Sequence, residues 1–537
     1  LKSRANGIDF SQTATLHYAR AYFNATLLGD IFTRMGLPPE SLEFLTRGAK
    51  FNKPPLMTTL RNTPGLLRLL GQENSLPKQF ARAQQTVFAP ALAAWKETTV
   101  NELHDSAIAT RIETILDLLK QATYFNILGP LSLALRQAIL NVDFADLDSS
   151  QNPEVRALED LKLLATQLRS RLPELGLNSP ITPDTHQEPN NSASLFAAIS
   201  EHPEGPLVFD QLDQFLEKYG YLSDVATDIA VPTWKESPQP VRELLTQFLL
   251  NPETAPVQAT RSSDSKDLGQ KGPHTQAKSP KWKVRTVQTR LNLKGQIAEV
   301  YNRLLAELRG CFVELESRWV SSGLLEAQGD IFFLSWADIQ TQLKTFPAAD
   351  QTAADQAAAD QTDSTARSRD DSHPVDIKLV DIKLKVQLQK VQWQQQGEHR
   401  VPYLVYGQSA STPLPSTAAL PPVSAGTLQG IGASAGQVEG TVRVLKNLSA
   451  GLTDIDTQTI LVVPYTDAGW SPLLARIGGL IAEVGGQLSH GAIVAREYGI
   501  PAIMDVPDAT HRLTTGQRVR IDGRQGTIEI LHPTSQR

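Results

Sequence analysis

The sequence predicts a multidomain protein with a mostly α-helical N-terminal region and a C-terminal α/β (β/β/α) domain. Three observations predict this fold class. The length of 537 residues suggests roughly three to four domains of about 150 residues each. Apolar residues follow a helical period through most of the first half of the chain. Near the C-terminus, short strand patterns bounded by glycine alternate with short helical patterns.

The N-terminal helices are predicted from apolar residues at spacings of three and four, as in residues 106–138 and 155–172. Strand signals are sparse in this part of the chain. We therefore expect residues 1–250 to form a helical domain. We expect residues 282–345 to continue it, and residues 375–407 to close the helical region with a helix or strand segment.

Three segments have the composition of insertions or linkers. Residues 251–281 are rich in Ser, Gln and Lys, which predicts a disordered insertion. Residues 346–374 contain three copies of a five-residue unit, AADQT or AADQA, and are predicted as a low-complexity insertion. Residues 408–426 are built of Ser, Thr, Ala and four prolines, which predicts an extended linker. Such a linker could let a domain reach two sites, or serve as a passive spacer.

The C-terminal residues 427–537 are predicted to form the α/β domain, of about 110 residues. The expected strands are residues 440–445, 459–464, 480–484 and 502–506, followed by a hairpin over 518–530.

Charge and composition exclude several classes of protein. The 57 acidic and 51 basic residues give a net charge of −6, so no nucleic-acid footprint is expected. No window reaches the roughly 18 apolar residues of a membrane span, and no secretory signal is present. The single cysteine, Cys311, excludes an internal disulfide framework and fits the reducing cytoplasm. Because the chain begins with Leu1 rather than methionine, we expect a missing upstream part.

The most informative segment is GGQLSHGAIVAREYGIPAI, from Gly485 to Ile503. It predicts a short helical run from Gly491 to Tyr498, with His490 at its start, Ser489 as a cap and Gly499 at its end. A helix start has unpaired N–H groups and the positive end of the helix dipole. Both would stabilise a phosphoryl group on the His490 ring. With a reference pKa of about 6.5, the imidazole is mostly neutral at pH 7 and nucleophilic. Alternatively, His490 is a surface or capping histidine.

This segment resembles the phosphohistidine loop of the swivelling domain in phosphoenolpyruvate-utilising enzymes. Residues 466–486 resemble the loop and strand that precede the histidine in that family, and residues 430–445 resemble its entry strands. The resemblance implies that His490 is the phosphoryl acceptor and donor.

The same resemblance implies supporting roles for neighbouring residues. Ser489, Gly491 and Gly486 would shape the phosphate site, and Arg496 would neutralise its charge one turn along the helix. Arg496 could equally lie on a solvated helix face or in an ion pair. Trp470 matches the family and is expected to pack. The segment shows no metal-ligand spacing, so no metal site is expected.

Parts of the helical region resemble the antibiotic-phosphorylating branch of the family, in the rifampin phosphotransferase and phosphoenolpyruvate synthase-like group. The matching segments are residues 20–24, 219–238 and 322–339. This chain has Tyr221 and Leu222 where the branch usually has a His-Arg pair, so a phosphate or substrate contact from that pair is in doubt.

The family resemblance implies a dikinase-type phosphotransferase. His490 would carry a phosphoryl group from ATP to a small-molecule acceptor bound by the helical region. The sequence has no Walker-type glycine loop and no segment like the family's ATP-grasp domain. ATP and Mg²⁺ are therefore expected to bind an ATP-grasp domain that lies upstream or acts in trans, and not this chain. The alternatives are a phosphoenolpyruvate synthase-like protein and a degenerate, non-catalytic binding protein.

Overall fold

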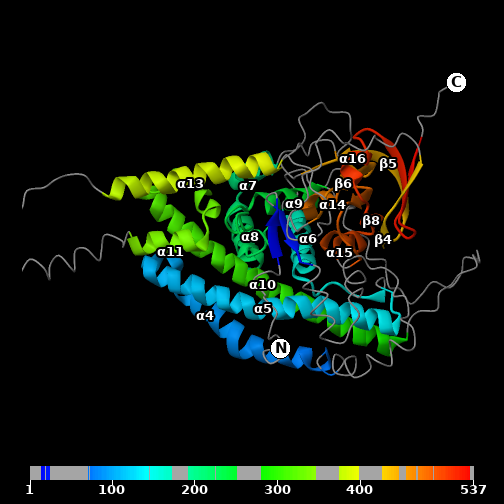
Figure 1. The fold of residues 1–537 in the computed structure, drawn as a ribbon. Helices are drawn as coiled ribbons and strands as arrows, with labels where there is room; N and C mark the ends of the chain where they lie inside the picture. The colour runs from blue at the N-terminus through cyan, green and yellow to red at the C-terminus, as the bar shows by residue number, and fades with distance from the viewer. Residues whose placement is uncertain are drawn as a thin grey trace, which may run out of the picture. The chain divides into compact units, whose positions relative to one another are not determined.

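The computed structural model is drawn as a ribbon in Figure 1. It describes residues 14–17, 20–24, 71, 73–143, 146–171, 192–223, 225, 227–250, 280–345, 374–397, 426–446, 455–466, 470–487 and 489–531. The two predicted insertions and the predicted linker lie outside these residues, apart from the last one or two positions of each. No helix in the described ranges is long and apolar enough to cross a membrane.

The chain forms two compact units. Unit 1 consists of residues 1–27, 78–124 and 303–418, and unit 2 consists of residues 28–77, 125–302 and 419–537. The long helices α5 (Asp105–Leu140) and α10 (Lys281–Ser321) contribute residues to both units. The α/β domain and part of the helical region thus belong to one unit, and the finer domain boundaries stay predictions.

Unit 1 contains a β-hairpin in a region that the sequence pattern predicts as helical. Strand β1 (Ala14–His17) pairs antiparallel with β2 (Arg20–Phe23), with Thr15 opposite Tyr22. Each strand has four residues, which is too short for an alternating pattern to stand out in a window of about 11 to 18 residues. The structure therefore corrects the helical prediction at this point.

The other described elements of unit 1 are helical. Besides parts of α5 and α10, they are η2 (Gln84–Phe88), α4 (Ala89–Glu97), η3 (Val100–Glu102), η7 (Asp330–Phe333), α11 (Trp336–Thr345) and α13 (Pro374–Gly397). The buried carboxylate of Glu316 on α10 accepts hydrogen bonds from the N–H groups of Gly329, at 2.8 Å, and Ile331, at 3.0 Å. These bonds hold the turn that leads into η7 against α10.

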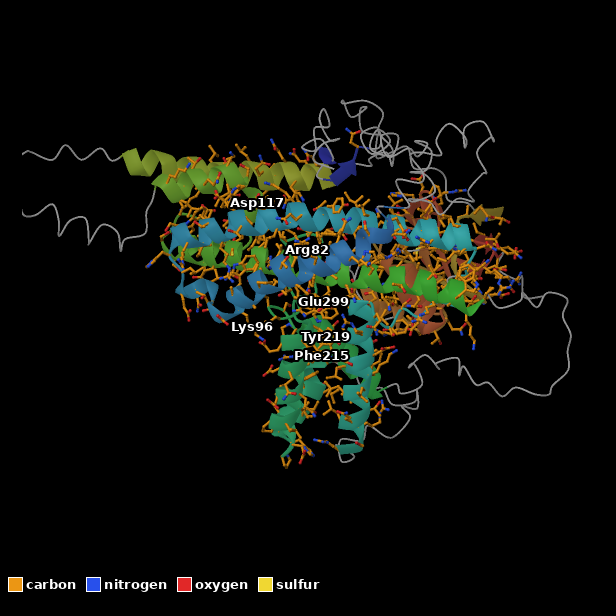
Figure 2. All side chains as sticks on the ribbon, turned by 90° about the horizontal axis from the view of Figure 1, so that it is seen from below. Arg82, Lys96, Asp117, Phe215, Tyr219 and Glu299 are labelled. Carbon is orange, nitrogen blue, oxygen red and sulfur yellow. The ribbon has the colours of Figure 1, made fainter. Side chains whose placement is uncertain are left out.

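Four further helices in the described part of unit 2 precede the sheet in the sequence and pack through apolar faces. They are α6 (Pro153–Arg171), α7 (Ser192–Glu201), α8 (Gly205–Tyr219) and α9 (Gln239–Leu250). Phe215 and Tyr219 lie on successive turns of α8 (Figure 2), with ring centroids 5.1 Å apart. The Tyr219 hydroxyl donates to the Asp160 carboxylate of α6 at 2.7 Å. Apolar packing and this hydrogen bond together fix α8 on α6.

The C-terminal part of unit 2 is an eight-stranded mixed sheet, which confirms the predicted α/β domain. The strands are β3 (Gly426–Gln429), β4 (Ile431–Ser434), β5 (Gln437–Val444), β6 (Thr459–Val463), β7 (Gly479–Ala482), β8 (Ala502–Met504), β9 (Arg518–Asp522) and β10 (Thr527–Ile530). Their order is β3-β10-β9-β5-β6-β7-β8-β4. Strands β5 to β8 run parallel, and the remaining pairs are antiparallel.

The sheet buries side chains on both faces, as expected for central parallel strands. Ile460 and Val462 of β6 belong to a core with β9 and β10, whereas Leu461 and Val463 face the opposite core. Helices α14 (Ser471–Leu474), α15 (His490–Tyr498) and α16 (Ala509–Arg512) accompany the strands (Figure 1). The core that contains Leu461 continues without a break into apolar side chains of α6, α7, α8 and α9.

Candidate functional site

Helix α15 begins at His490, one residue before the predicted run, and ends at Tyr498 as the sequence predicts. Ser489 has extended backbone angles, and Gly499 ends the helix in the left-handed region with φ 67°. The Ser489 hydroxyl makes no capping bond to the helix but donates to the carbonyl of Gly486 at 2.7 Å. Ser489 thus closes the turn between Gly486 and the helix. Its predicted contact with phosphate, and that of Gly486, stay predictions.

Gly491 allows α15 to approach the loop that follows β6. A Cβ atom at this position would lie 2.2 Å from Oγ1 of Thr466, a distance that no side chain tolerates. The Gly491 N–H donates to the same Oγ1 at 3.1 Å. One of the N–H groups at the helix start is therefore engaged by the protein itself, and a role for Gly491 in phosphate binding stays a prediction.

Arg496 ties the loop before His490 to strand β4. Its guanidinium donates to the carbonyls of Ala433 and Gln487, both at 2.8 Å. The Gln487 amide in turn donates to the carbonyl of Gly432 at 3.1 Å. Burial lowers the pKa of Arg496 to about 10, so it stays charged at neutral pH. These contacts are structural, and a contact between Arg496 and phosphate stays a prediction.

The His490 side chain lies at the start of α15. Its residue is partly exposed, yet both ring nitrogens are buried and have no hydrogen-bond partner among the described residues. Burial lowers the pKa of His490, Glu154 raises it, and the positive charge of Lys294 lowers it further. The net effect favours the neutral imidazole, whose lone pair is the nucleophile needed for phosphoryl transfer.

Two charged residues of the helical region act on His490, and neither was singled out from the sequence. Glu154 lies in the first turn of α6 and Lys294 lies on α10. Burial lowers the pKa of Lys294 to about 8. The sequence held a signal for Lys294, because it occupies the apolar stripe of α10 that includes the buried residues Leu291 and Ile297. A lysine in such a stripe is an unusual residue to bury.

The C-terminal end of α15 packs against α6 and α9. The Lys162 ammonium lies 4.6 Å from the ring centroid of Tyr498 and 5.4 Å from that of Phe248. Burial lowers the pKa of Lys162 to about 8. Burial also raises the pKa of Glu497, which accepts a hydrogen bond from Ser149. The helix that carries His490 is thus docked on the helical region by both apolar and charged contacts.

Tyr221 and Leu222, which replace the His-Arg pair expected from the resemblance, lie just beyond the end of α8. Leu222 is 1% exposed and belongs to the core, and its carbonyl accepts the N–H of Trp234 at 2.7 Å. Tyr221 packs partly buried against the same core. At this position the chain has core packing where the family has polar side chains. Trp470 is 3% exposed and packs as expected.

Two family models match the chain. Residues 455–526 match the model described as "PEP-utilising enzyme, mobile domain", and residues 133–311 match "Rifampicin phosphotransferase fourth domain". The first match contains the entire loop and helix around His490. Residues 455–526 are therefore similar to the mobile domain of phosphoenolpyruvate-utilising enzymes, and part of the helical region is similar to a domain of rifampicin phosphotransferase.

Curated relatives are similar to about a fifth of the chain. The rifampicin phosphotransferase of Streptomyces sviceus is 47% identical over 106 residues, which is 20% of this chain and 12% of the relative. The rifampicin phosphotransferase of Bacillus cereus is 50% identical over 103 residues, 19% of this chain and 12% of the relative. The prodigiosin synthesizing transferase PigC of Serratia marcescens is 41% identical over 107 residues, which is 20% of this chain and 12% of the relative. Each match thus covers about an eighth of the relative.

Solved structures add nothing to these similarities. A crystal structure of aconitase X from Thermococcus kodakaraensis matches with 23% identity and a TM-score of 0.18, over 20% of this chain and 99% of that chain. In the described residues, no group of three or more His, Cys, Asp or Glu is arranged to hold a metal ion.

Proposed function

We propose that this chain carries a phosphoryl group on His490 and delivers it to a small-molecule acceptor bound by the helical region. The observation that carries the proposal is the His490 ring at the start of α15, with both nitrogens buried and without a partner. A buried imidazole without hydrogen bonds is costly, and one ring nitrogen has a lone pair that can form a bond to a phosphoryl group.

In the proposed transfer, the lone pair of a His490 ring nitrogen attacks phosphorus, and the bond from phosphorus to the donor oxygen breaks. Delivery reverses this step, because an acceptor oxygen attacks phosphorus and the phosphorus–nitrogen bond breaks. The Lys294 ammonium would stabilise the negative charge on the oxygens of the phosphoryl group during its transfer. Glu154 would balance the positive charge of Lys294 while the phosphoryl group is absent.

The donor side of the proposal needs a second protein part. ATP and Mg²⁺ would bind an ATP-grasp domain, placed upstream in a longer enzyme or supplied in trans, where Mg²⁺ neutralises the phosphates. The residues of this chain would then receive the phosphoryl group. The α/β domain and helices α6 to α9 share one apolar core, and in this proposal that docked arrangement is the position for delivery. Loading at a distant site would require this apolar contact to open.

The experiment that tests the proposal follows phosphate on the protein. With a matching ATP-grasp partner and ATP labelled at the transferred phosphate, the wild-type chain should gain acid-labile, base-stable label. His490→Ala should abolish the label, and His511→Ala, in the same domain, should retain it. Label that persists in His490→Ala would overturn the assignment of the carrier.

A second function is favoured by one observation, the buried Leu222 in place of a polar family residue. In this alternative the chain binds a small molecule or partner without transferring phosphate. This alternative would be supported if the wild-type chain gains no label from an ATP-grasp partner that does label a related carrier.

A further inference from the structure

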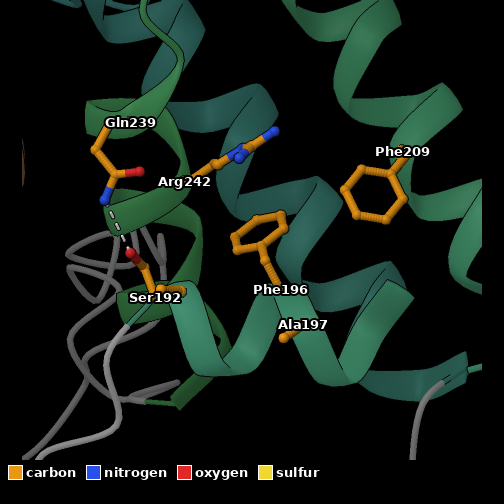
Figure 3. Close-up of a pocket in the computed structure, with 7 residues that line it drawn as sticks. Ser192, Phe196, Ala197, Phe209, Gln239 and Arg242 are labelled. Atoms are coloured by element: carbon orange, nitrogen blue, oxygen red, sulfur yellow. Dashed lines mark hydrogen bonds between the residues drawn. The ribbon is translucent and has the colours of Figure 1, made fainter. Parts of the chain in front are cut away.

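A cavity of about 400 Å³ lies among helices α7, α8 and α9 of unit 2 (Figure 3). Its volume falls within the range of roughly 300 to 1,000 Å³ that is usual for small-molecule sites. The residues that line it are Ser192, Ala193, Phe196, Ala197, Phe209, Gln239 and Arg242. None of them belongs to the site around His490.

Two aromatic rings form part of the wall of the cavity. Phe196 of α7 and Phe209 of α8 have ring centroids 6.2 Å apart, at an interplanar angle of 49°. Ala193 and Ala197 are small and exposed, so they leave the cavity open to solvent. Tilted aromatic rings beside open space suit a flat apolar group, which gains contact area with both rings.

Arg242 is a polar residue of the cavity wall whose side-chain N–H groups have no hydrogen-bond acceptor among the described residues. Its Nε atom is buried without a partner, and its side chain makes no hydrogen bond or ion pair with the described part of the chain. By contrast, Gln239 donates to the hydroxyl of Ser192 at 3.1 Å and to the carboxylate of Glu243 at 2.9 Å (Figure 3). Arg136 and Arg156 of the same unit both pair with carboxylates.

Arg242 contacts the ring of Phe196. The guanidinium carbon lies 5.3 Å from the ring centroid of Phe196, and Figure 3 shows both side chains approaching from facing helices. The N–H groups of a guanidinium point outward in its plane. A carboxylate in that plane accepts two parallel hydrogen bonds.

The charges around the cavity favour an anion. No acidic residue is among the residues that line it, and Arg242 lies in the first turns of the 12-residue helix α9, near the positive end of its dipole. We propose that this cavity binds a small molecule with an aromatic body and a carboxylate. Arg242 holds the carboxylate, and Phe196 and Phe209 contact the aromatic body.

The test measures binding of 2-naphthoate to the full chain by isothermal titration calorimetry. The wild type should bind saturably below about 1 mM, and Arg242→Gln should weaken binding at least about tenfold, or about 1.4 kcal/mol. The neutral 2-naphthamide should bind the wild type correspondingly less well. Arg518→Gln, at an exposed position on β9, removes the same charge elsewhere and should bind like the wild type.

A second pair of variants tests the location without changing the charge. Ala197→Trp should fill the cavity and abolish binding, whereas Ala198→Trp, at the next exposed position of α7, should leave binding unchanged. The proposal is overturned if the wild type shows no saturable binding, or if Arg242→Gln and Ala197→Trp, with wild-type melting temperatures, bind as tightly as the wild type.

Discussion

Lys294 on α10 lies close enough to His490 at the start of α15 for its charge to lower the pKa of the imidazole. The two residues come from the helical region and the α/β domain, and they meet within unit 2. In the proposed function, His490 is the nucleophile and Lys294 is a cation that stabilises phosphate. Their proximity is what that proposal requires of the position in which phosphate is delivered.

The charge of Lys294 can be tested through the titration of His490. Replacing Lys294 with Met removes a positive charge that disfavours the imidazolium, so the pKa of His490 should rise. Lys281→Met, at an exposed position of the same helix, should leave it unchanged. NMR titration of the imidazole resonances measures the pKa of His490 in both variants. An unchanged or lower pKa in Lys294→Met would show that the two groups do not interact.

The fit of Gly491 against Thr466 predicts a strong effect for the addition of one methyl group. Gly491→Ala should lower the free energy of unfolding by about 1 to 3 kcal/mol, because the new Cβ atom overlaps Oγ1 of Thr466. Gly310→Ala provides the control in a helix, since a Cβ atom there meets nothing within 4 Å. That variant should be neutral or stabilising by up to about 1 kcal/mol. Denaturant unfolding distinguishes the two, and equal effects would contradict the packing.

Arg496 should act on the loop through the two carbonyls that it holds. Arg496→Met removes the hydrogen bonds to Ala433 and Gln487, so amide exchange in the loop that precedes His490 should become faster. Arg496→Lys should restore protection only in part, because an ammonium does not reproduce the planar fork of a guanidinium. Hydrogen-exchange mass spectrometry measures both variants. Unchanged exchange in Arg496→Met would favour the predicted role in phosphate binding over the structural one.

The sequence predicted the helix at His490 because its signals are local. Ser489 precedes the helix and Gly499 ends it, and both signals lie within a few residues of the backbone positions that they govern. The same holds for the strands β5 to β10, which follow glycine-bounded apolar runs. Lys294 and Glu154 could not be placed beside His490 in this way. Their proximity depends on the packing of α6 and α10 against the α/β domain, which no local pattern encodes.

Lys162 predicts a pH dependence of stability. Folding lowers its pKa from 10.5 to about 8, chiefly through burial, against the opposing charges of Glu159 and Glu497. Between these two pH values the unfolded chain holds the proton and the folded chain has released it, so this lysine makes the free energy of unfolding rise with pH. Below pH 8 both states are protonated, and the contribution is constant and unfavourable.

The measurement compares denaturant unfolding of the wild type and Lys162→Met from pH 7 to pH 10. The rise in unfolding free energy with pH should be smaller in the variant, because it lacks this titration. Lys96→Met, at an exposed position of α4 (Figure 2), should retain the wild-type rise. Parallel pH profiles for the wild type and Lys162→Met would show that Lys162 is not buried between the two rings.

The docked position of α15 can be tested through the hydroxyl of Tyr498, which is buried without a hydrogen-bond partner among the described residues. Burial raises the pKa of Tyr498, as it does that of Tyr219. Removing an unsatisfied buried hydroxyl removes a desolvation cost, so Tyr498→Phe should be neutral or should raise the unfolding free energy by about 1 kcal/mol. Tyr219→Phe loses the bond to Asp160 and should lower it by about 0.5 to 1.5 kcal/mol. If Tyr498→Phe destabilises the protein as much as Tyr219→Phe, the hydroxyl of Tyr498 has a partner in solution, and α15 does not rest on α6 as described.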